Sequence, residues 1–366
     1  MHIAANNKLT FLLAALCPLF QPNLLQAVNG LQIGPLLSTC VDACQRGCAE
    51  IRSVQACRER TGDDLKFELK DSSDSRSALT EADGKAQRAI IGALRAEWGD
   101  DLRIVGEEDN DEVFTDDDDK TEFEPLRRDL FDDDIGETAE IEIADFTIFV
   151  DPLDGTREFV EGRLANCQSL VGVAMNGKSI GGAIGIPFPA GDLSTEATIV
   201  YGIAEMGTGT LGAPLTRGPF PLDRNIDGVK YPRPHIATGD STAPIMTACK
   251  EAIIKPLKGS NVLYGGAGNK ILAAALGEVA CSIQHTYGGP WDLCAPEAIL
   301  TAMGGRITDL FGDEIAIYGD DAPPRCNERG YVVTPPGSTI DHDAITAKLL
   351  ATPFVQEYQK SLNEAE

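Results

Sequence analysis

Positive charge is scarce in this sequence. Its 31 lysine and arginine residues stand against 57 aspartate and glutamate residues, so the formal net charge is −26. A chain this acidic repels a phosphate backbone unless cations intervene, and we therefore expect no nucleic-acid polymer as a partner. A small anionic substrate is still compatible with this charge if acidic groups bind divalent cations, because bound cations reverse the local sign of the field.

Cysteine motifs are also lacking. Ten cysteines in 366 residues are too few for a disulfide scaffold, and none forms the C-x-x-C pair typical of zinc or thiol redox sites. Cys40, Cys44 and Cys48 recur at a spacing of four residues, which places them on one helix face, where small apolar side chains permit close packing. We predict that these three thiols pack in the core and do not bind a metal.

The apolar run Leu9–Phe20 is too short to cross a bilayer as a helix, so we expect no membrane span. Lys8 precedes the run and Ala27 could precede a cleavage site, as in a signal peptide, although Pro18 interrupts the pattern. Residues 1–30 are therefore a candidate targeting segment. We expect a cytoplasmic protein, or an organellar or secreted one if this segment directs it there.

The rest of the chain carries helical and strand patterns that alternate as in layered α/β proteins. With 43% hydrophobic residues it can bury one large core or two medium-sized ones. Apolar periodicity predicts helices at 34–60, 81–98, 243–254, 269–276, 293–303 and from about 342. Short apolar runs predict strands at 103–106, 145–150, 167–175, 179–186, 197–203, 235–238, 261–264, 279–284, 306–310 and 330–334.

These patterns divide the chain into two halves. Residues 31–206 are predicted to form helices packed on an antiparallel sheet, in which Asn176-Gly177 joins two strands as a hairpin. Residues 207–366 are predicted to form a second α/β unit that begins with a proline- and glycine-rich passage. The acidic stretch 108–142 is predicted to be an insertion, and its run Asp116–Asp119 a solvated block of charge.

The segment Asp151-Pro152-Leu153-Asp154-Gly155-Thr156 directly follows the apolar strand pattern at 146–150. It places two carboxylates at a strand end, where Pro152 fixes the backbone between them and Gly155 permits a tight turn. Thr156 would then open a helix whose free N–H groups can hold a phosphate. An ordinary aspartate-rich turn capped by Thr156 would explain the same six residues.

Two further carboxylates can converge on this point. Glu107 and Asp292 each follow a strand-like or glycine-rich segment. Unit charges about 4 Å apart repel by roughly 4 kcal/mol at an effective dielectric of about 20, so converged carboxylates require cations. Oxygen ligands with no histidine or cysteine nearby favour Mg²⁺ or Mn²⁺ over zinc, and a pair of such ions roughly 3.5–4 Å apart suits hydrolysis of a phosphate ester.

Three ordered motifs carry a resemblance to a known family. They are Gly106-Glu107-Glu108-Asp109, the 151–156 segment, and Trp291-Asp292-Leu293-Cys294-Ala295-Pro296-Glu297 followed by Gly304-Gly305. From about Leu36 to its end, the sequence resembles the inositol monophosphatase superfamily. Within that superfamily, Gly265-Gly266-Ala267-Gly268-Asn269-Lys270 and the sequence at 294–297 are most similar to the 3′(2′),5′-bisphosphate nucleotidases.

The resemblance implies a layered αβαβα sandwich of the sugar-phosphatase type, an α/β (α+β) fold, with two or three Mg²⁺ ions between its halves. The implied metal ligands are Glu107, Asp151, the Leu153 carbonyl, Asp154, Asp292 and Asp83. It also implies that Asp83 and Thr156 activate the attacking water. A carboxylate that polarises a hydroxyl can relay the proton of a water already acidified by a metal ion.

Simpler interpretations exist for several of these residues. Thr80-x-x-Asp83 fits a helix capping box, so Asp83 could serve only the backbone. Asp292 could merely cap a helix that begins at Leu293. We interpret Trp291 as a packing residue rather than one that stacks on substrate, and Glu108 and Asp109 as solvated neighbours of Glu107.

For the substrate, the resemblance implies contacts with Thr156, Asp292, Gly266, Lys270, Ser241 and Thr242. Gly266 and Lys270 would offer backbone and ammonium groups to phosphate oxygens. The segment Gly239-Asp240-Ser241-Thr242-Ala243 lacks the histidine often found there in the family, a departure that bears on adenine recognition and not on the metal chemistry.

The expected reaction is hydrolysis of adenosine 3′,5′-bisphosphate to AMP and phosphate, and of 3′-phosphoadenylyl sulfate at the same site, by a lithium-sensitive monomer or homodimer. One alternative is an inositol polyphosphate 1-phosphatase or inositol monophosphatase with the same metals. Another is a non-catalytic acidic cation-binding protein, whose binding would survive Asp292→Asn combined with Asp154→Asn.

Overall fold

The computed structural model describes residues 33–62, 67–69, 78–108, 123–130, 143–204, 206–217, 225–226, 229–230, 234–319, 327–338 and 340–364. The candidate targeting segment 1–30, Asp109 and the run Asp116–Asp119 lie outside these residues. In the part of the chain that the structure describes, no helix is long and apolar enough to cross a membrane.

Two large sheets and eight α-helices make up most of the described chain. The first sheet contains β3 (Arg103–Gly106), β4 (Phe146–Asp154), β5 (Gln168–Met175), β6 (Lys178–Ile186), β7 (Thr198–Ile203) and β8 (Gly207–Gly212). The second contains β11 (His235–Thr238), β12 (Ser260–Leu263), β13 (Cys281–Gln284), β14 (Arg306–Thr308) and β15 (Tyr331–Thr334). The helices are α1 (Ile33–Thr61), α2 (Glu81–Trp98), α4 (Thr156–Val160), α5 (Pro244–Leu257), α6 (Ala267–Ala275), α7 (Pro290–Ala302), α8 (His342–Leu350) and α9 (Pro353–Asn363).

Minor elements complete the described structure. Two small sheets contain two strands each. One pairs β1 (Phe67–Leu69) with β2 (Ala78–Thr80), and the other pairs β9 (Asn225–Ile226) with β10 (Val229–Lys230). Single 3₁₀ turns form at Ile143–Asp145 and Leu164–Asn166.

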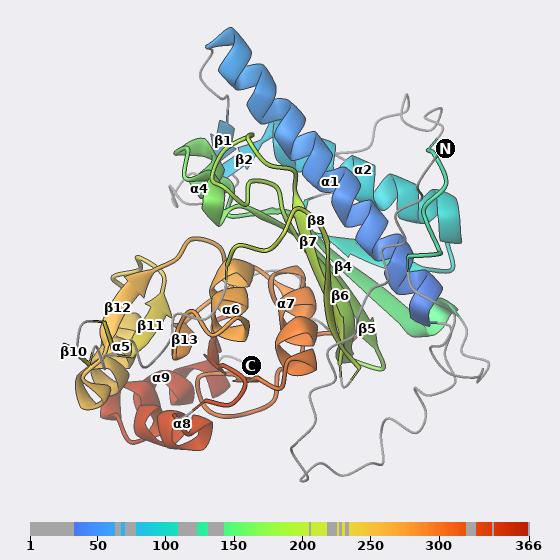
Figure 1. The fold of residues 1–366 in the computed structure, drawn as a ribbon. Coiled ribbons are helices and arrows are strands. Elements are labelled where there is room, and N and C mark those ends of the chain that lie inside the picture. The colour runs from blue at the N-terminus through green and yellow to red at the C-terminus, as the bar shows by residue number, and fades with distance from the viewer. Residues whose placement is uncertain are drawn as a thin grey trace.

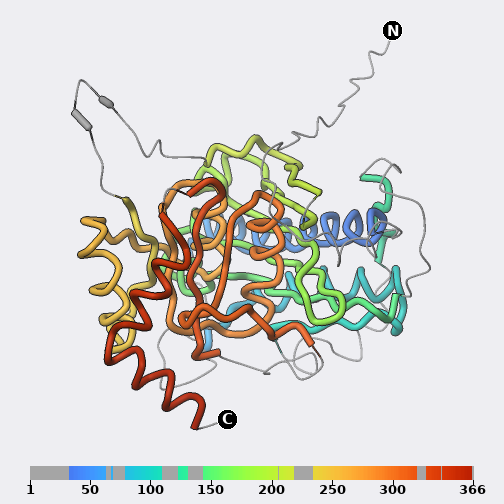
Figure 2. The backbone as a smooth tube through the Cα atoms, turned by 90° about the horizontal axis from the view of Figure 1, so that it is seen from below, coloured from blue at the N-terminus to red at the C-terminus, as the bar shows by residue number. Residues whose placement is uncertain are grey.

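These elements stack in five layers (Figure 1). The first sheet has the order β3-β4-β5-β6-β7-β8 and the second the order β12-β11-β13-β15-β14. Helices α1 and α2 pack on one face of the first sheet, and α6 and α7 lie between the two sheets. Helices α5, α8 and α9 pack together beyond the second sheet (Figure 2). The predicted layered αβαβα sandwich is confirmed.

Side-chain alternation in the second sheet explains why it is covered on both faces. Ile236 and Val332 belong to the core that α5, α8 and α9 share with the sheet. Their strand neighbours Ala237 and Val333 belong instead to the core formed with α6 and α7. Successive residues of a strand point to opposite faces, so apolar residues at adjacent positions require a helical layer on each side.

The first sheet is not wholly antiparallel, contrary to the prediction. Strand β3 runs parallel to β4, with Gly106 opposite Val150, whereas β4 to β8 pair antiparallel. A parallel neighbour needs a long crossover connection, and the acidic stretch between β3 and β4 supplies one. The carboxyl ends of β3 and β4 therefore lie at the same sheet edge, which brings Glu107 beside Asp151.

Other predictions for the first half are confirmed by the structure. Asn176 and Gly177 join β5 to β6 with φ values of 52° and 74°, as a two-residue turn with positive φ at both positions requires. Cys40, Cys44 and Cys48 are 0% exposed on α1, without disulfide bonds, and pack in the core between α1 and the first sheet.

Besides the short strands β1, β2, β9 and β10, two larger elements were not predicted from the sequence. The passage that begins at Gly207 starts with strand β8, which pairs with β7 and so belongs to the first sheet. Helix α9 follows α8 after a break at Ala351 and Thr352. The division into two subdomains, with a boundary at residue 206, stays a prediction.

Helix α7 lies very close to the first sheet where β5 carries a glycine. A Cβ on Gly172 would lie 2.5 Å from Cys294 Cβ and 2.7 Å from the Ala295 nitrogen. We expect Gly172→Ala to lower the free energy of unfolding by about 1–3 kcal/mol, because the backbone of α7 must move. Urea unfolding measures this, and a Gly172→Ala protein as stable as wild type would contradict it.

Gly84 offers the matched control. It lies in α2 with no heavy atom within 4 Å of an added Cβ. Gly84→Ala is therefore expected to raise the free energy of unfolding by about 0.5–1 kcal/mol, since alanine has the better helix propensity.

Candidate active site

The motif at 151–156 folds as a strand end with an irregular register. Strand β4 pairs regularly with β5 up to Asp151, and the register then shifts before Asp154. The Leu153 N–H donates to Asp151 Oδ1 at 3.0 Å, which fixes one carboxylate against its own backbone. Gly155 then adopts a φ of 87°, a left-handed conformation that suits glycine, and Thr156 begins α4 as predicted.

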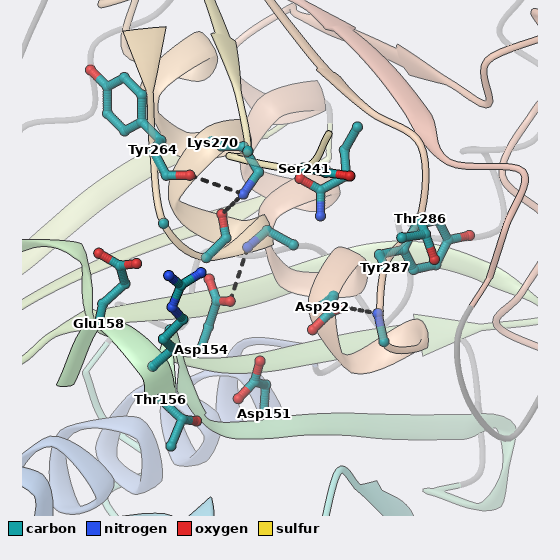
Figure 3. Close-up of a pocket in the computed structure, with 18 of the residues that line it drawn as sticks. Asp151, Asp154, Thr156, Glu158, Ser241, Tyr264, Lys270, Thr286, Tyr287 and Asp292 are labelled. Carbon is teal, nitrogen blue, oxygen red and sulfur yellow. Dashed lines mark hydrogen bonds between the residues drawn. The ribbon is translucent and has the colours of Figure 1, made fainter. Parts of the chain in front are cut away.

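Asp151, Asp154 and Asp292 converge at this edge. Each offers a carboxylate oxygen, these oxygens lie within 4.8 Å of one another, and all three residues are buried (Figure 3). Glu107 follows β3, its N–H donates to the Val150 carbonyl at 3.0 Å, and the residue lines the same cavity. Leu153 also lines this cavity.

Asp292 lies inside helix α7 and does not cap it. Helix α7 begins at Pro290 with Gly289 as N-cap, so the suggestion that Asp292 caps a helix starting at Leu293 is wrong. Asp292 lies in the first turn and its Oδ2 accepts the Gly288 N–H at 2.5 Å. Its carboxylate is thereby turned towards the cluster.

Burial and the neighbouring carboxylates raise the pKa of Asp151, Asp154 and Asp292. For Asp151 burial is the main cause, followed by the charges of Glu107, Asp154 and Asp292. Burial raises the pKa of Asp154 to about 6, although Lys270 and two backbone N–H groups oppose the shift. Burial, with Asp154 and Glu107, raises the pKa of Asp292 to about 7.

Shifts of this kind are expected where several carboxylates gather in a way that could hold a cation. Three buried carboxylates in such proximity require positive charge, and hard oxygen donors suit Mg²⁺. The donor set therefore fits the predicted metal.

The first turn of α6 fixes Asp154. Its Oδ1 accepts the Ala267 N–H at 2.9 Å and its Oδ2 accepts the Asn269 N–H at 3.3 Å. A Cβ on Gly266 would lie 2.5 Å from Asp154 Oδ2, so the start of α6 approaches the carboxylate as only glycine allows. The two halves of the chain thus meet at a predicted metal ligand.

Asp83 caps a helix and also contacts Thr156. Its Oδ2 accepts the Thr80 N–H at 2.8 Å and the Thr80 hydroxyl at 2.6 Å, which completes the capping box of α2. Its Oδ1 accepts the Thr156 hydroxyl at 2.8 Å. The same hydroxyl lies 2.9 Å from the Leu153 carbonyl oxygen. Asp83 is 0% exposed and contacts Thr156 rather than the cluster of three aspartates.

A cavity of about 410 Å³ opens above the cluster. Of the predicted substrate contacts, Thr156, Asp292, Ser241, Gly266 and Lys270 line it, as Figure 3 shows in part. Thr242 does not line it and is exposed, two residues before α5 begins. The structure thus brings together all but one of these residues.

Lys270 is more constrained than the sequence suggested. It is 3% exposed, and its Nζ donates to the Tyr264 and Gly266 carbonyls. Burial lowers its pKa, while the charges of Asp154 and Asp292 oppose this shift. Its ammonium group stabilises the glycine loop, so it is already engaged at the cavity wall.

Two neighbouring interpretations have different outcomes. Glu108 is 7% exposed, so its prediction as a solvated residue is wrong. The Gln87 side chain on α2 accepts the Glu108 N–H at 3.1 Å and donates to its carbonyl at 2.9 Å, which draws the residue inward. Trp291 is 5% exposed, packs in the core around α6 and α7, and does not line the cavity, as predicted.

Several lining residues were not found from the sequence. They include Arg157, Glu158, Asp240, Tyr264 and the segment from Gln284 to Gly288. The only sequence signal for Arg157 was its position next to Thr156, and the only one for Asp240 was its position next to Ser241. Nothing in the sequence indicated that the turn after β13 would close the cavity.

The chain belongs to the inositol monophosphatase family, whose model matches residues 38–353. It is 32% identical to 3′(2′),5′-bisphosphate nucleotidase 1 of Dictyostelium discoideum, over 83% of this chain and 94% of that protein. It is also 32% identical to human 3′(2′),5′-bisphosphate nucleotidase 1, over 66% of this chain and 74% of that one. The predicted resemblance is confirmed.

The solved structures agree on the fold. The crystal structure of the extragenic suppressor protein suhB from Bartonella henselae matches 86% of this chain and 98% of its own, with a TM-score of 0.58 at 18% identity.

Proposed function

We propose that this chain is a Mg²⁺-dependent phosphomonoesterase that hydrolyses adenosine 3′,5′-bisphosphate to AMP and phosphate, and 3′-phosphoadenylyl sulfate at the same site. The observation that carries the proposal is the convergence of Asp151, Asp154 and Asp292 at the wall of a cavity. Similarity to 3′(2′),5′-bisphosphate nucleotidase 1 over most of the chain supports this choice of substrate.

The metal ions would be held by Glu107, Asp151, the Leu153 carbonyl, Asp154 and Asp292. Bound Mg²⁺ would acidify a water and stabilise negative charge on the phosphoryl group. The protein prepares these ligands in advance, because backbone N–H groups of Leu153, Ala267 and Gly288 already orient the three aspartates. Little reorganisation is then needed when the substrate binds.

Asp83 and Thr156 would take the proton of the attacking water. The Thr156 hydroxyl donates to Asp83 Oδ1, so the lone pairs of Thr156 Oγ1 can accept a proton from a water. As the water oxygen bonds to phosphorus, its proton passes to Thr156 and the threonine proton passes to Asp83. The bond from phosphorus to the ribose oxygen breaks, and that oxygen takes a proton from solvent.

Phosphate release tests this proposal. We expect adenosine 3′,5′-bisphosphate to be hydrolysed faster than inositol 1-phosphate or inositol 1,4-bisphosphate in the presence of Mg²⁺, with inhibition by lithium and by EDTA. Preference for an inositol ester would replace the substrate and keep the metal chemistry. Absence of phosphate release from all of these esters would contradict the proposal.

A further inference from the structure

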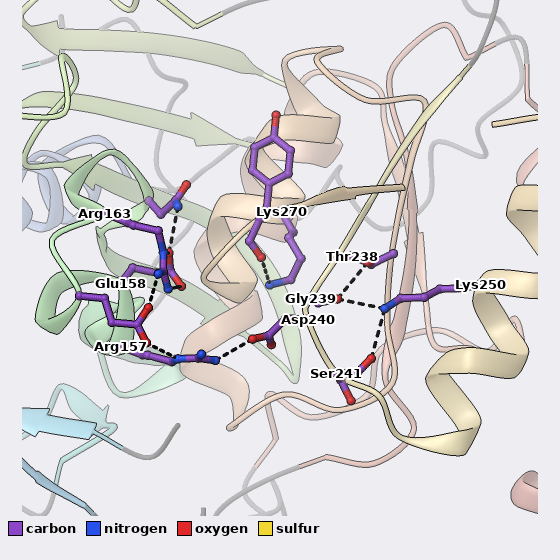
Figure 4. Close-up of polar contacts among 12 residues, drawn as sticks. Arg157, Glu158, Arg163, Thr238, Gly239, Asp240, Ser241, Lys250 and Lys270 are labelled. Carbon is purple, nitrogen blue, oxygen red and sulfur yellow. Dashed lines mark hydrogen bonds and ion pairs between the residues drawn. The ribbon is translucent and has the colours of Figure 1, made fainter. Parts of the chain in front are cut away.

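Arg157 and Asp240 form an ion pair across the cavity. Arg157 lies on α4 directly after Thr156, and its Nη1 donates to Asp240 Oδ2 at 2.7 Å (Figure 4). Its Nε donates at 2.9 Å to Oε1 of Glu161, the residue that directly follows α4. Asp240 lies after β11, in the other half of the chain, and both residues line the cavity. The pair therefore links two parts of the cavity wall that lie 83 positions apart in the sequence.

The cavity wall is rich in negative charge. The lining carboxylates are Glu107, Asp151, Asp154, Glu158, Asp240 and Asp292. Of the lining residues that the structure describes, Arg157 and Lys270 carry the permanent positive charges. Lys270 is almost fully buried against backbone carbonyls, whereas the Arg157 side chain is 35% exposed. Arg157 is thus the cation at this wall that an incoming anion can reach.

We propose that Arg157 binds a second phosphate group of the substrate and determines specificity for bisphosphorylated esters, while Asp240 holds the guanidinium until that phosphate displaces it. The inference rests on the proposed function, because it concerns the phosphate that is not hydrolysed. The reacting phosphate would lie at the aspartate cluster, which Thr156 adjoins.

The chemistry of the pair suits such an exchange. A phosphate group carries about −1.5 to −2 charges and three acceptor oxygens, against one charge on the Asp240 carboxylate. A guanidinium binds phosphate through two parallel N–H donors. Glu161 can keep its contact with Nε during the exchange, so the arginine stays anchored while its Nη groups turn to the substrate.

Two esters that differ only in the second phosphate test this. The ratio of kcat/KM for adenosine 3′,5′-bisphosphate to that for adenosine 3′-monophosphate is measured in each variant. Arg157→Gln is expected to lower this ratio about tenfold, mainly through KM for the bisphosphate, because the contact is made equally in the ground and transition states. Asp240→Asn is expected to raise the ratio, because the phosphate then displaces no carboxylate.

Arg306→Gln is the matched control. Arg306 forms an exposed pair with Asp343 at 2.8 Å and lies outside the cavity wall, so this variant removes the same charge elsewhere and should leave the ratio unchanged. Inositol 1,4-bisphosphate and inositol 1-phosphate form a second pair of esters. If only their ratio falls in Arg157→Gln, the second phosphate belongs to an inositol ester.

The outcomes separate this inference from the function on which it rests. If Arg157→Gln lowers kcat/KM equally for the bisphosphate and the monophosphate, Arg157 serves the reacting phosphate and the inference is wrong while the phosphatase stands. A fall of the ratio in Asp240→Asn would show that the pair is a structural unit, which also overturns it. A wild-type protein that hydrolyses none of the four esters overturns both.

Discussion

The Asp151→Asn protein is expected to lose phosphatase activity and, in EDTA, to be more stable than wild type. Asp151 is 1% exposed, and its burial raises its pKa, together with the charges of Glu107, Asp154 and Asp292. Without cations, removal of one buried charge should raise the free energy of unfolding by about 1–2 kcal/mol, a part of the roughly 4 kcal/mol repulsion of a close pair. Activity should fall at least about a thousandfold, because the metal contribution amounts to several kcal/mol.

Mg²⁺ should reverse the order of stabilities. A ligand that binds only the folded state stabilises it by about 2.7 kcal/mol at a hundred times its dissociation constant. Mg²⁺ should give wild type this stabilisation and should give the Asp151→Asn protein little of it. Urea unfolding in EDTA and in Mg²⁺, with phosphate release on the same samples, measures both effects.

The same cluster gives wild type a pH dependence in EDTA. The pKa values of Asp154, about 6, and Asp292, about 7, lie above the ordinary 3.8. Between about pH 4 and 7 the folded protein therefore binds more protons than the unfolded chain, so its stability falls as the pH rises. Asp151→Asn should make this fall shallower, because one source of repulsion is gone.

Asp309→Asn is the control for a buried aspartate outside the cluster. Asp309 is 3% exposed and accepts the Phe311 and Asp313 N–H groups and the Arg329 guanidinium. Neutralising it leaves Arg329 without this partner, so Asp309→Asn should be less stable than wild type in EDTA and in Mg²⁺ alike. If Asp151→Asn behaved like Asp309→Asn in EDTA, the cluster would be an ordinary hydrogen-bonded site and not a cation site.

The cluster was predictable because its parts lie in short segments with fixed geometry. Asp151 and Asp154 share one strand end, and Glu107 directly follows the neighbouring strand, whose last residue, Gly106, pairs with Val150. Asp292 could be placed from the sequence because it lies at the start of a predicted helix. Pro290 at the start of α7 is a known helix-start signal that the predicted start at Leu293 overlooked.

Contacts between distant segments could not be predicted. The burial of Glu108 depends on Gln87, a residue 21 positions earlier on a helix whose rotation the sequence does not fix. The Arg157–Asp240 pair joins residues 83 positions apart. Strand β8 consists largely of glycine and threonine and exists because β7 offers it an edge. In each case tertiary pairing, and not local propensity, decides the structure.

The second large effect is expected at Asp83, which holds a helix end with one oxygen and Thr156 with the other. Asp83→Ala should lower kcat by about 10²–10⁴-fold, the usual contribution of a positioned base. It should also lower the free energy of unfolding by about 0.5–2 kcal/mol, because the capping box is lost. Phosphate release and urea unfolding report the two losses separately.

Two variants separate the capping role of Asp83 from its role towards Thr156. Thr80→Ala removes the capping hydroxyl and leaves the bond from Thr156 to Asp83 Oδ1, so it should cost about 0.5–2 kcal/mol of stability with kcat largely kept. Thr156→Val removes the hydroxyl and keeps the cap, so it should lose kcat as Asp83→Ala does with little change in stability. Thr156→Ser retains a hydroxyl and should recover most of the rate.

The double variant Asp83→Ala with Thr156→Val decides whether the two residues form one proton relay. Groups that act as a unit are not additive, so the double variant should be no slower than Asp83→Ala alone. If the two losses instead multiplied, Thr156 and Asp83 would act independently, and the 2.8 Å bond between them would only stabilise the start of α4. A loss of kcat in Thr80→Ala as large as that in Asp83→Ala would likewise mean that the carboxylate matters through the helix it caps and not through the proton it accepts.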